Sequence, residues 1–242
     1  MKLLVDSGNT RLKWSFYGDD ALINGHAFIN EAVSRHTLIE AWREQAPTCL
    51  AIASVSLTPL IALLTSVAME LWPTIEIVHV KSEAHAFGVY NAYTQPEKLG
   101  VDRWLALVAV HNHYQKAACI VDCGTAITVD LIDAKGKHQG GLISPGLTLM
   151  KQALSKKIIA LPLQLTNYQA GIANSTESGI HGGTLAAAVG LIEHVFNQQP
   201  KDMLLILTGG DAVIIAEQLD IMPIIDIDLV LRGLVVILDK HR

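Results

Sequence analysis

The chain has 242 residues, half of them apolar and 17% charged, with a formal net charge of −5 at pH 7. This composition supplies enough apolar surface for a substantial core and argues against intrinsic disorder. The negative net charge argues against a nucleic-acid partner, whose phosphates are usually neutralised by a basic surface.

No stretch approaches the roughly 18 apolar residues of a membrane-spanning helix, and Asp6 interrupts the apolar run near the N-terminus. We therefore expect neither a signal peptide nor a membrane partner. The cysteines Cys49, Cys119 and Cys123 are odd in number and lack the spacing of metal ligands. We interpret them as small buried residues in a reducing cytoplasm.

The first half is predicted to alternate strands with helices. Two strands over 2–6 and 10–17 are joined by a turn at Ser7-Gly8-Asn9. The other predicted elements are strands at 22–29, 49–55 and 75–80, and helices at 34–45 (with Ser34 as cap), 58–71 and 100–114. Residues 86–96 are polar and aromatic without a regular period, so we predict a functional loop there.

The second half restarts this pattern after a polar segment at 111–116. The predicted strands are 117–122, 125–132, 138–144, 203–207 and 222–226, and the predicted helices follow Pro145-Gly146, span 176–198, follow Asp211 and span 228–239. Strands alternating with helices, with a hairpin opening each half, predict an α/β fold with mixed sheets. We expect two half-domains, 1–115 and 116–242.

The helix predicted at 176–198 contains four glycines: Gly179, Gly182, Gly183 and Gly190. Each glycine inside a helix costs about 1 kcal/mol relative to alanine. Two explanations stay open, namely an irregular start of the helix, or close approach of its backbone to another element or a second subunit.

The strongest indication of function is a short sequence motif that occurs twice. An apolar run ends in Asp-x-Gly at Asp6 and again at Asp122, 116 residues later. Glycine lets an anion approach the backbone, turn N–H groups donate to phosphate, and a carboxylate reaches phosphate through hydrated Mg2+. Asn9, Thr10 and Lys13 add polar and positive groups to the first copy. A simple Asx turn is the alternative, but two copies favour phosphate binding between two similar half-domains.

Two further segments have candidate chemistry. Asp102 and Arg103 open an apolar helix. Asp102 is either a first-turn carboxylate favoured by the helix dipole, or a base for a substrate hydroxyl beside an anion-binding Arg103. Thr208-Gly209-Gly210-Asp211 is either a strand-to-helix turn or a flat surface for a ligand. The P-loop, dinucleotide and nucleophile-elbow motifs are absent.

Together these motifs resemble those of the type III pantothenate kinases, a family of the acetate and sugar kinase, Hsp70 and actin superfamily. The matching segments, in family order over the whole chain, are Asp6 to Lys13, Gly100 to Arg103, Asp122 to Ala126, Gly140-Gly141 with Pro145-Gly146, and Thr208 to Asp211. The resemblance implies two ribonuclease H-like (actin-like ATPase) half-domains with mixed sheets flanked by helices. Val101 stands where many members carry alanine.

The resemblance also implies ATP-dependent phosphorylation of pantothenate to 4'-phosphopantothenate, the first step of coenzyme A biosynthesis. The implied ATP-binding residues are Asp6, Ser7, Gly8, Asn9, Thr10, Arg11, Leu12, Lys13 and Thr125. The implied pantothenate-binding residues are Tyr93, Gly100, Val101, Asp102, Arg103 and Thr176, with Ser175 a neighbouring candidate for the role of Thr176. Asp102 is the implied general base, and Asp122 the implied ligand of an activating potassium or ammonium ion.

By the same resemblance we expect Mg2+ with ATP, a cytoplasmic homodimer, and a subunit contact that involves the glycine-bearing helix. Two alternatives stay open. An accessory regulator of transcription is opposed by the acidic charge and the lack of a basic recognition helix. Another kinase of the superfamily, acting on a sugar, is disfavoured by the Gly-x-Asp-Arg segment.

Overall fold

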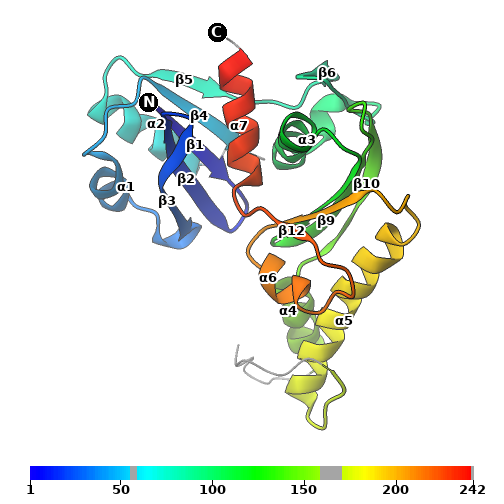
Figure 1. Ribbon diagram of the computed structural model, residues 1–242. Helices are drawn as coiled ribbons and strands as arrows, with labels where there is room; N and C mark the ends of the chain where they lie inside the picture. Colours follow the sequence, from blue (N-terminus) through cyan, green and yellow to red (C-terminus); the bar gives the residue numbers. More distant parts are fainter. Residues whose placement is uncertain (55–58, 159–170, 241–242) are drawn as a thin grey trace. The chain divides into compact units, whose positions relative to one another are not determined.

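The computed structural model describes residues 1–54, 59–158 and 171–240. The chain forms two compact units. Unit 1 comprises Met1–Tyr114 and Asp228–Arg242, and unit 2 comprises Gln115–Ile227. Each unit is built around a five-stranded sheet (Figure 1).

The sheet of unit 1 has the strand order β3-β2-β1-β4-β5. Its strands are β1 (Lys2–Ser7), β2 (Arg11–Gly18), β3 (Ala21–Ile29), β4 (Cys49–Ser54) and β5 (Glu76–His79). Strand β1 pairs antiparallel with β2 and parallel with β4. Leu3, Leu4 and Val5 of β1 are fully buried, as expected for a central strand covered on both faces.

Two helices cover one face of this sheet. Helix α1 (Arg35–Trp42) and helix α2 (Pro59–Leu71) enclose an apolar core with Trp14 and Phe16 of β2. Ser34 caps α1 as predicted, because its Oγ accepts a hydrogen bond from the N–H of Thr37. Short 3-10 turns, η1 (Asn30–Ala32) and η2 (Pro96–Lys98), connect the longer elements.

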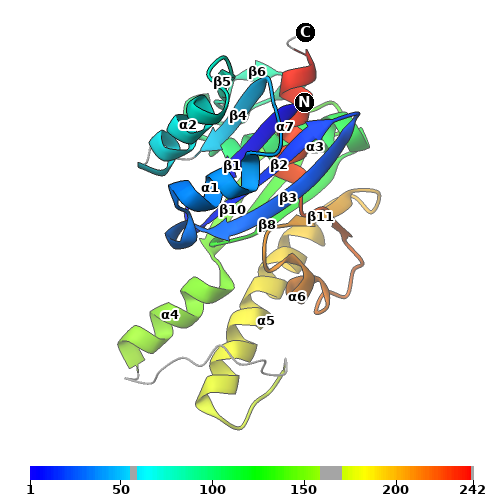
Figure 2. The ribbon, with the colours of Figure 1, turned by 90° about the vertical axis from the view of Figure 1, so that its left-hand side faces the viewer.

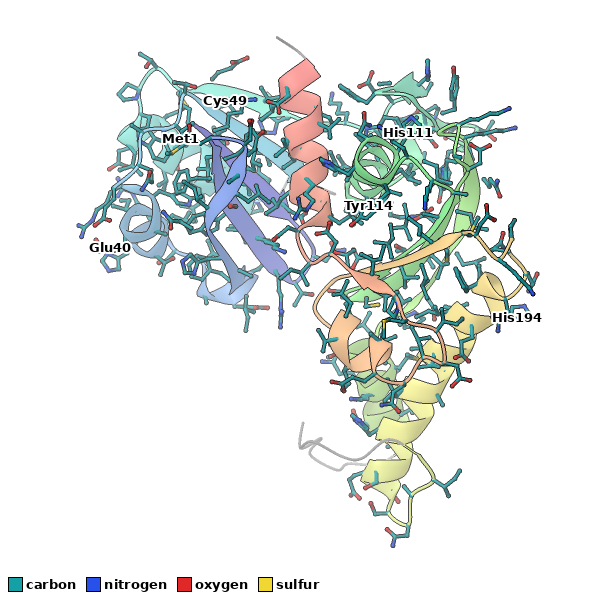
Figure 3. All side chains as sticks on the ribbon, viewed as in Figure 1. Met1, Glu40, Cys49, His111, Tyr114 and His194 are labelled. Carbon is teal, nitrogen blue, oxygen red and sulfur yellow. The ribbon has the colours of Figure 1, made fainter. Side chains whose placement is uncertain are left out.

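Helices α3 (Val101–Tyr114) and α7 (Leu229–Lys240) pack against each other, and α7 also contacts β1, β2 and β4 (Figure 1). His111 and Tyr114 mark the C-terminal half of α3 in Figure 3. A Cβ at Gly233 of α7 would overlap the backbone of Leu105 in α3, so glycine permits this close helix contact.

The position of α7 corrects the predicted half-domain 116–242. Residues from Asp228 onward belong to unit 1. The physical reason is burial, because Leu231 and Leu234 of α7 are 1% and 0% exposed within that unit. An amphipathic helix packs wherever a complementary apolar surface exists, whatever its place in the sequence.

Unit 2 repeats the strand order of unit 1, as β10-β9-β8-β11-β12. Its strands are β8 (Ala118–Cys123), β9 (Ala126–Ile132), β10 (His138–Pro145), β11 (Leu204–Thr208) and β12 (Ile224–Ile225). Helices α4 (Leu147–Ile158) and α5 (Thr176–Phe196) pack together (Figure 2), and α6 (Ala212–Ala216) follows β11. The predicted α/β class with mixed sheets flanked by helices is confirmed.

The predicted loop at 86–96 contains a small hairpin that the sequence analysis missed. Strands β6 (His85–Ala86) and β7 (Val89–Tyr90) are joined by Phe87 and Gly88, whose φ angles are 55° and 82°. Two successive positive φ angles are typical of a tight hairpin turn. Asn112 of α3 donates to the carbonyl oxygen of Phe87 at 3.0 Å, and this tertiary contact explains a turn without the usual Asn-Gly signal.

The predicted ends Val55 and Thr58 of two first-half elements lie outside the described residues. Helix α5 is regular, which excludes the irregular start proposed for its glycines. A Cβ at Gly182 would lie 2.6 Å from the carbonyl oxygen of Gly171, so this glycine permits close approach of another segment. Within the described part of the chain, nothing lies within 4 Å of a Cβ built at the other three.

Candidate active site

The first Asp-x-Gly segment joins β1 to β2. Asp6 lies opposite Lys13 in the antiparallel register, so both side chains project from the same face of the sheet. The N–H of Gly8 donates to the carbonyl of Arg11 at 3.0 Å and closes the turn. Asn9 is exposed at the tip. A carboxylate, an ammonium group and an exposed turn therefore converge, which is the chemistry needed to bind MgATP phosphates.

Asn30 holds this turn in place, and the sequence analysis missed it. Its Nδ2 donates to the carbonyl oxygens of Gly8 at 3.0 Å and Asn9 at 3.1 Å, and its N–H donates to Thr10 at 2.9 Å. An asparagine at the end of a strand carries no local signal for this role. The strand order, which brings β3 beside β2, creates the contact.

The Gly-x-Asp-Arg segment begins α3. One carboxylate oxygen of Asp102, Oδ1, accepts a hydrogen bond from the N–H of Arg103 at 2.8 Å. A Cβ at Gly100 would lie only 2.5 Å from that oxygen. Glycine therefore provides the space in which the Asp102 carboxylate sits, as a site for a substrate hydroxyl requires.

Arg103 is 6% exposed, so its guanidinium group lies largely out of water. Its Nη1 donates to the hydroxyl oxygen of Tyr93 at 2.8 Å. Desolvated guanidinium groups bind carboxylates strongly through their fixed fork of donors. The structure thus brings Tyr93, Gly100, Asp102 and Arg103 together in unit 1.

Asn91 organises the loop that carries Tyr93, and it too was missed. Its Oδ1 accepts from the N–H of Tyr93 at 2.9 Å, and its Nδ2 lies within hydrogen-bonding distance of the carbonyl oxygens of Glu83 and Pro96, at 3.1 and 3.2 Å. One side chain therefore connects three points of the loop. A signal was present in the sequence, because Asn often bonds to the backbone two residues further on.

The second Asp-x-Gly segment joins β8 to β9 in unit 2. Asp122 lies opposite neutral Thr128 on β9 and beside Thr208 on β11. Its Oδ1 would lie 3.2 Å from a Cβ at Gly124 and would overlap a Cβ at Gly209, whose φ is +92°. Two glycines from two strand ends therefore make room around this carboxylate. Making room for Asp122 is therefore a structural role of Gly209 in the Thr-Gly-Gly-Asp segment.

Oxygen ligands in a cradle of glycine backbone fit a hard cation such as potassium or ammonium. Asp122 is the residue of this segment that would hold such an ion, through its carboxylate. In the described ranges, no group of three or more His, Cys, Asp or Glu side chains is arranged to hold a metal.

Thr125 and Thr176 also lie in unit 2, and both are exposed. The carbonyl of Thr125 accepts the N–H of Gly146 at 2.9 Å, which ties the β8–β9 turn to the start of α4. The hydroxyl of Ser175 caps α5 by accepting the N–H of Ser178 at 3.3 Å. Ser175 is therefore engaged in capping, whereas Thr176 is the first residue of the helix.

The sequence analysis missed a partly buried pair in unit 2. Lys151 Nζ of α4 lies 2.9 Å from His181 Nδ1 of α5. Burial lowers the pKa of Lys151, partly opposed by Asp211, and burial together with Lys151 lowers the pKa of His181. The histidine therefore favours its neutral form and accepts a hydrogen bond from the lysine.

Comparisons with known proteins identify the family of this chain. The family model described as type III pantothenate kinase matches residues 2–198. A type III pantothenate kinase from Nitrosococcus oceani is 34% identical, over 97% of this chain and 92% of the relative. The chain belongs to the type III pantothenate kinase family.

Solved structures agree on the fold of this type III pantothenate kinase family member. A Baf-family transcriptional activator from Campylobacter jejuni has a TM-score of 0.64 at 22% identity, covering 99% of this chain and 98% of that one. A 2-dehydro-3-deoxygalactonokinase from Sinorhizobium meliloti has a TM-score of 0.60 at 10% identity, covering 100% and 99%. With the repeated strand order, these likenesses support two ribonuclease H-like half-domains of the actin-like class.

No helix in the part of the chain that the structure describes combines the length and the apolar character needed to cross a bilayer.

Proposed function

We propose that this chain transfers the γ-phosphoryl group of MgATP to pantothenate, forming 4'-phosphopantothenate and ADP in the first step of coenzyme A biosynthesis. Membership of the type III pantothenate kinase family supports this activity. The single structural observation that carries the proposal is the cluster of Asp102, Arg103 and Tyr93 at the start of α3. It supplies a carboxylate for a hydroxyl group and a guanidinium group for a carboxylate, the two ends of pantothenate.

In the proposed mechanism, the pantothenate hydroxyl oxygen attacks the γ-phosphorus while the bond to the β-phosphate oxygen breaks. Asp102 orients the hydroxyl and accepts its proton, and Arg103, held by Tyr93, binds the substrate carboxylate. Positioning and electrostatic stabilisation contribute most of the catalysis in such transfers. The backbone from Asp6 to Lys13 is the proposed phosphate-binding segment of unit 1. In unit 2, the hydroxyl of Thr125 is a proposed contact of ATP and Thr176 a proposed contact of pantothenate.

Asp122 is proposed to bind an activating potassium or ammonium ion. The glycines that surround its carboxylate support this role. Mg2+ enters with ATP as part of the substrate. The chemistry that both ions would supply is positive charge beside the phosphates.

We further propose a cytoplasmic homodimer. Leu142 and Ile143 of β10 are 48% and 64% exposed, and Leu149 of α4 is 40% exposed. Exposed apolar side chains favour an interface, and Figure 2 shows α4 and α5 extending from the sheet of unit 2. Light scattering after size-exclusion chromatography measures the oligomeric state. We expect the variant Ile143→Glu to shift the population toward monomer.

A coupled ADP-release assay tests the function. The purified chain is supplied with MgATP and pantothenate, with a panel of sugars, or with no acceptor, each with and without potassium or ammonium. Among the acceptors, we expect only pantothenate to cause ADP release, and we expect the monovalent cation to increase its rate. Release with a sugar but not with pantothenate would assign the chain to sugar phosphorylation, and the absence of release under all conditions would remove the kinase proposal.

A further inference from the structure

The ammonium group of Lys13, in the proposed phosphate-binding segment, is paired with a carboxylate that lies 215 residues later in the chain. Nζ of Lys13 lies 2.8 Å from Oδ1 of Asp228, and the two side chains are 27% and 36% exposed. Asp228 is the residue at which the chain re-enters unit 1. Its carbonyl accepts the N–H of Arg232 at 2.9 Å, which fixes its backbone at the start of α7.

The position of Asp228 is set by core packing. Its helix is anchored by buried leucines and by the close contact between Gly233 and the backbone of Leu105. A second ion pair, Asp239 with Lys2 at 2.7 Å, lies near the other end of α7. Helix α7 thus contacts β1 and β2 and has a carboxylate–lysine pair near each end.

We propose that Asp228 is a positioning residue for phosphoryl transfer, which holds the ammonium group of Lys13 ready for the phosphates of ATP. This inference rests on the proposed function. A lysine ammonium has three donors, so an ion pair with Asp228 is compatible with donation to a phosphate oxygen. A free lysine side chain loses conformational entropy when a ligand orders it, whereas a prearranged one has lost that entropy on folding.

A double-mutant cycle tests the inference. We expect Asp228→Ala to lower kcat/KM for ATP about tenfold, or about 1.4 kcal/mol, and Asp228→Asn, which keeps an acceptor oxygen, to stay within about threefold. In a Lys13→Ala background, Asp228→Ala should have no further effect, because its role acts through Lys13. Asp239→Ala is the matched control. It removes the other ion pair of α7, and its effect on kcat/KM should be small.

A purely structural role would make the effects of Asp228→Ala and Lys13→Ala multiply, and that outcome overturns the proposal. An increase in kcat/KM on Asp228→Ala would also overturn it, because the carboxylate would then be competing with phosphate. Melting temperatures of all variants identify losses due to unfolding.

Calorimetric binding of a non-hydrolysable ATP analogue with Mg2+ separates this inference from the proposed function. If wild-type protein binds the analogue but does not phosphorylate pantothenate, the proposed function fails. In that case the double-mutant cycle is measured through the dissociation constant of the ATP analogue. We then expect Asp228→Ala to weaken binding in the wild-type background but not in the Lys13→Ala background.

Discussion

The two Asp-x-Gly segments occupy equivalent places in two sheets of the same strand order, yet their surroundings differ. Asp6 lies opposite a lysine in its hairpin, and that lysine is paired with Asp228. Asp122 lies opposite a threonine, and glycines at 124 and 209 leave space around its carboxylate. The first segment carries a cationic residue opposite its aspartate, whereas the second carries a neutral one.

This difference shows how one structural unit, used twice, can acquire two tasks. A strand end followed by a tight turn presents a carboxylate and backbone donors in both units. The residue across the hairpin then decides the local charge. We propose that Lys13 suits the first copy to phosphate, and that the neutral Thr128 suits the carboxylate of the second copy to a potassium or ammonium ion. Substitutions should therefore have different signatures in the two units.

The largest effect is expected in unit 1, from Asp102→Asn. Loss of the base and of its orientation of the hydroxyl should lower kcat about 100-fold or more, at every potassium concentration, with ATP affinity little changed. Steady-state kinetics with pantothenate and calorimetric ATP binding provide the measurements. Turnover close to that of the wild type would remove Asp102 from the mechanism.

A smaller and different effect is expected in unit 2, from Asp122→Asn. Loss of the charged ligand should weaken activation by potassium or ammonium about 10- to 100-fold, leaving the cation-free rate nearly unchanged. Titration of turnover against each cation measures this. Lys13→Ala is the control in unit 1, and it should lower activity while retaining the cation response. If turnover of Asp122→Asn and of the wild type depended on cation concentration in the same way, the second segment would have no separate role in cation binding.

Alanine substitutions of glycines in the two units should change the free energy of unfolding by different amounts. Gly209→Ala should destabilise the fold by about 1–3 kcal/mol, because φ is positive and the new Cβ would overlap Asp122. Gly8→Ala should cost less than about 1 kcal/mol, because its Cβ would meet Arg11 oxygen at 3.3 Å without a positive φ. Gly183→Ala, inside α5, should stabilise by up to about 1 kcal/mol. Urea unfolding curves rank the three variants, and any other order would contradict this account.

The smallest effect concerns the Lys151–His181 pair of unit 2. The pKa of His181 is lowered in the folded state by burial and by Lys151, so the unfolded chain binds the proton first as pH falls below about 6.5. Stability is therefore lost on acidification toward the folded pKa. His181→Gln keeps a polar partner for Lys151 without titrating. Its melting temperature should fall less than that of the wild type between pH 7.5 and 5, and an equal fall would contradict the assignment.

Local patterns predicted most of the elements. Apolar runs bounded by turn residues located the central strands, and the capping role of Ser34 was readable from its place before a helical pattern. The pairing of Asp6 with Lys13 follows from a short hairpin, since residues close in sequence fix its register. The small hairpin at 85–90 escaped prediction because a side chain of α3 supports its turn.

By itself, the sequence determined the α/β class, the repeated Asp-x-Gly turns and, through family motifs, the choice of Asp102, Arg103 and Asp122 as candidates. Those features depend on neighbouring residues and on the periodicity of apolar side chains. Only the tertiary structure decided that the last helix returns to unit 1, that Asp228 pairs with Lys13, and that Gly209 makes room for Asp122. Such contacts join residues far apart in the chain, and they form because buried surfaces on separate elements must pack together.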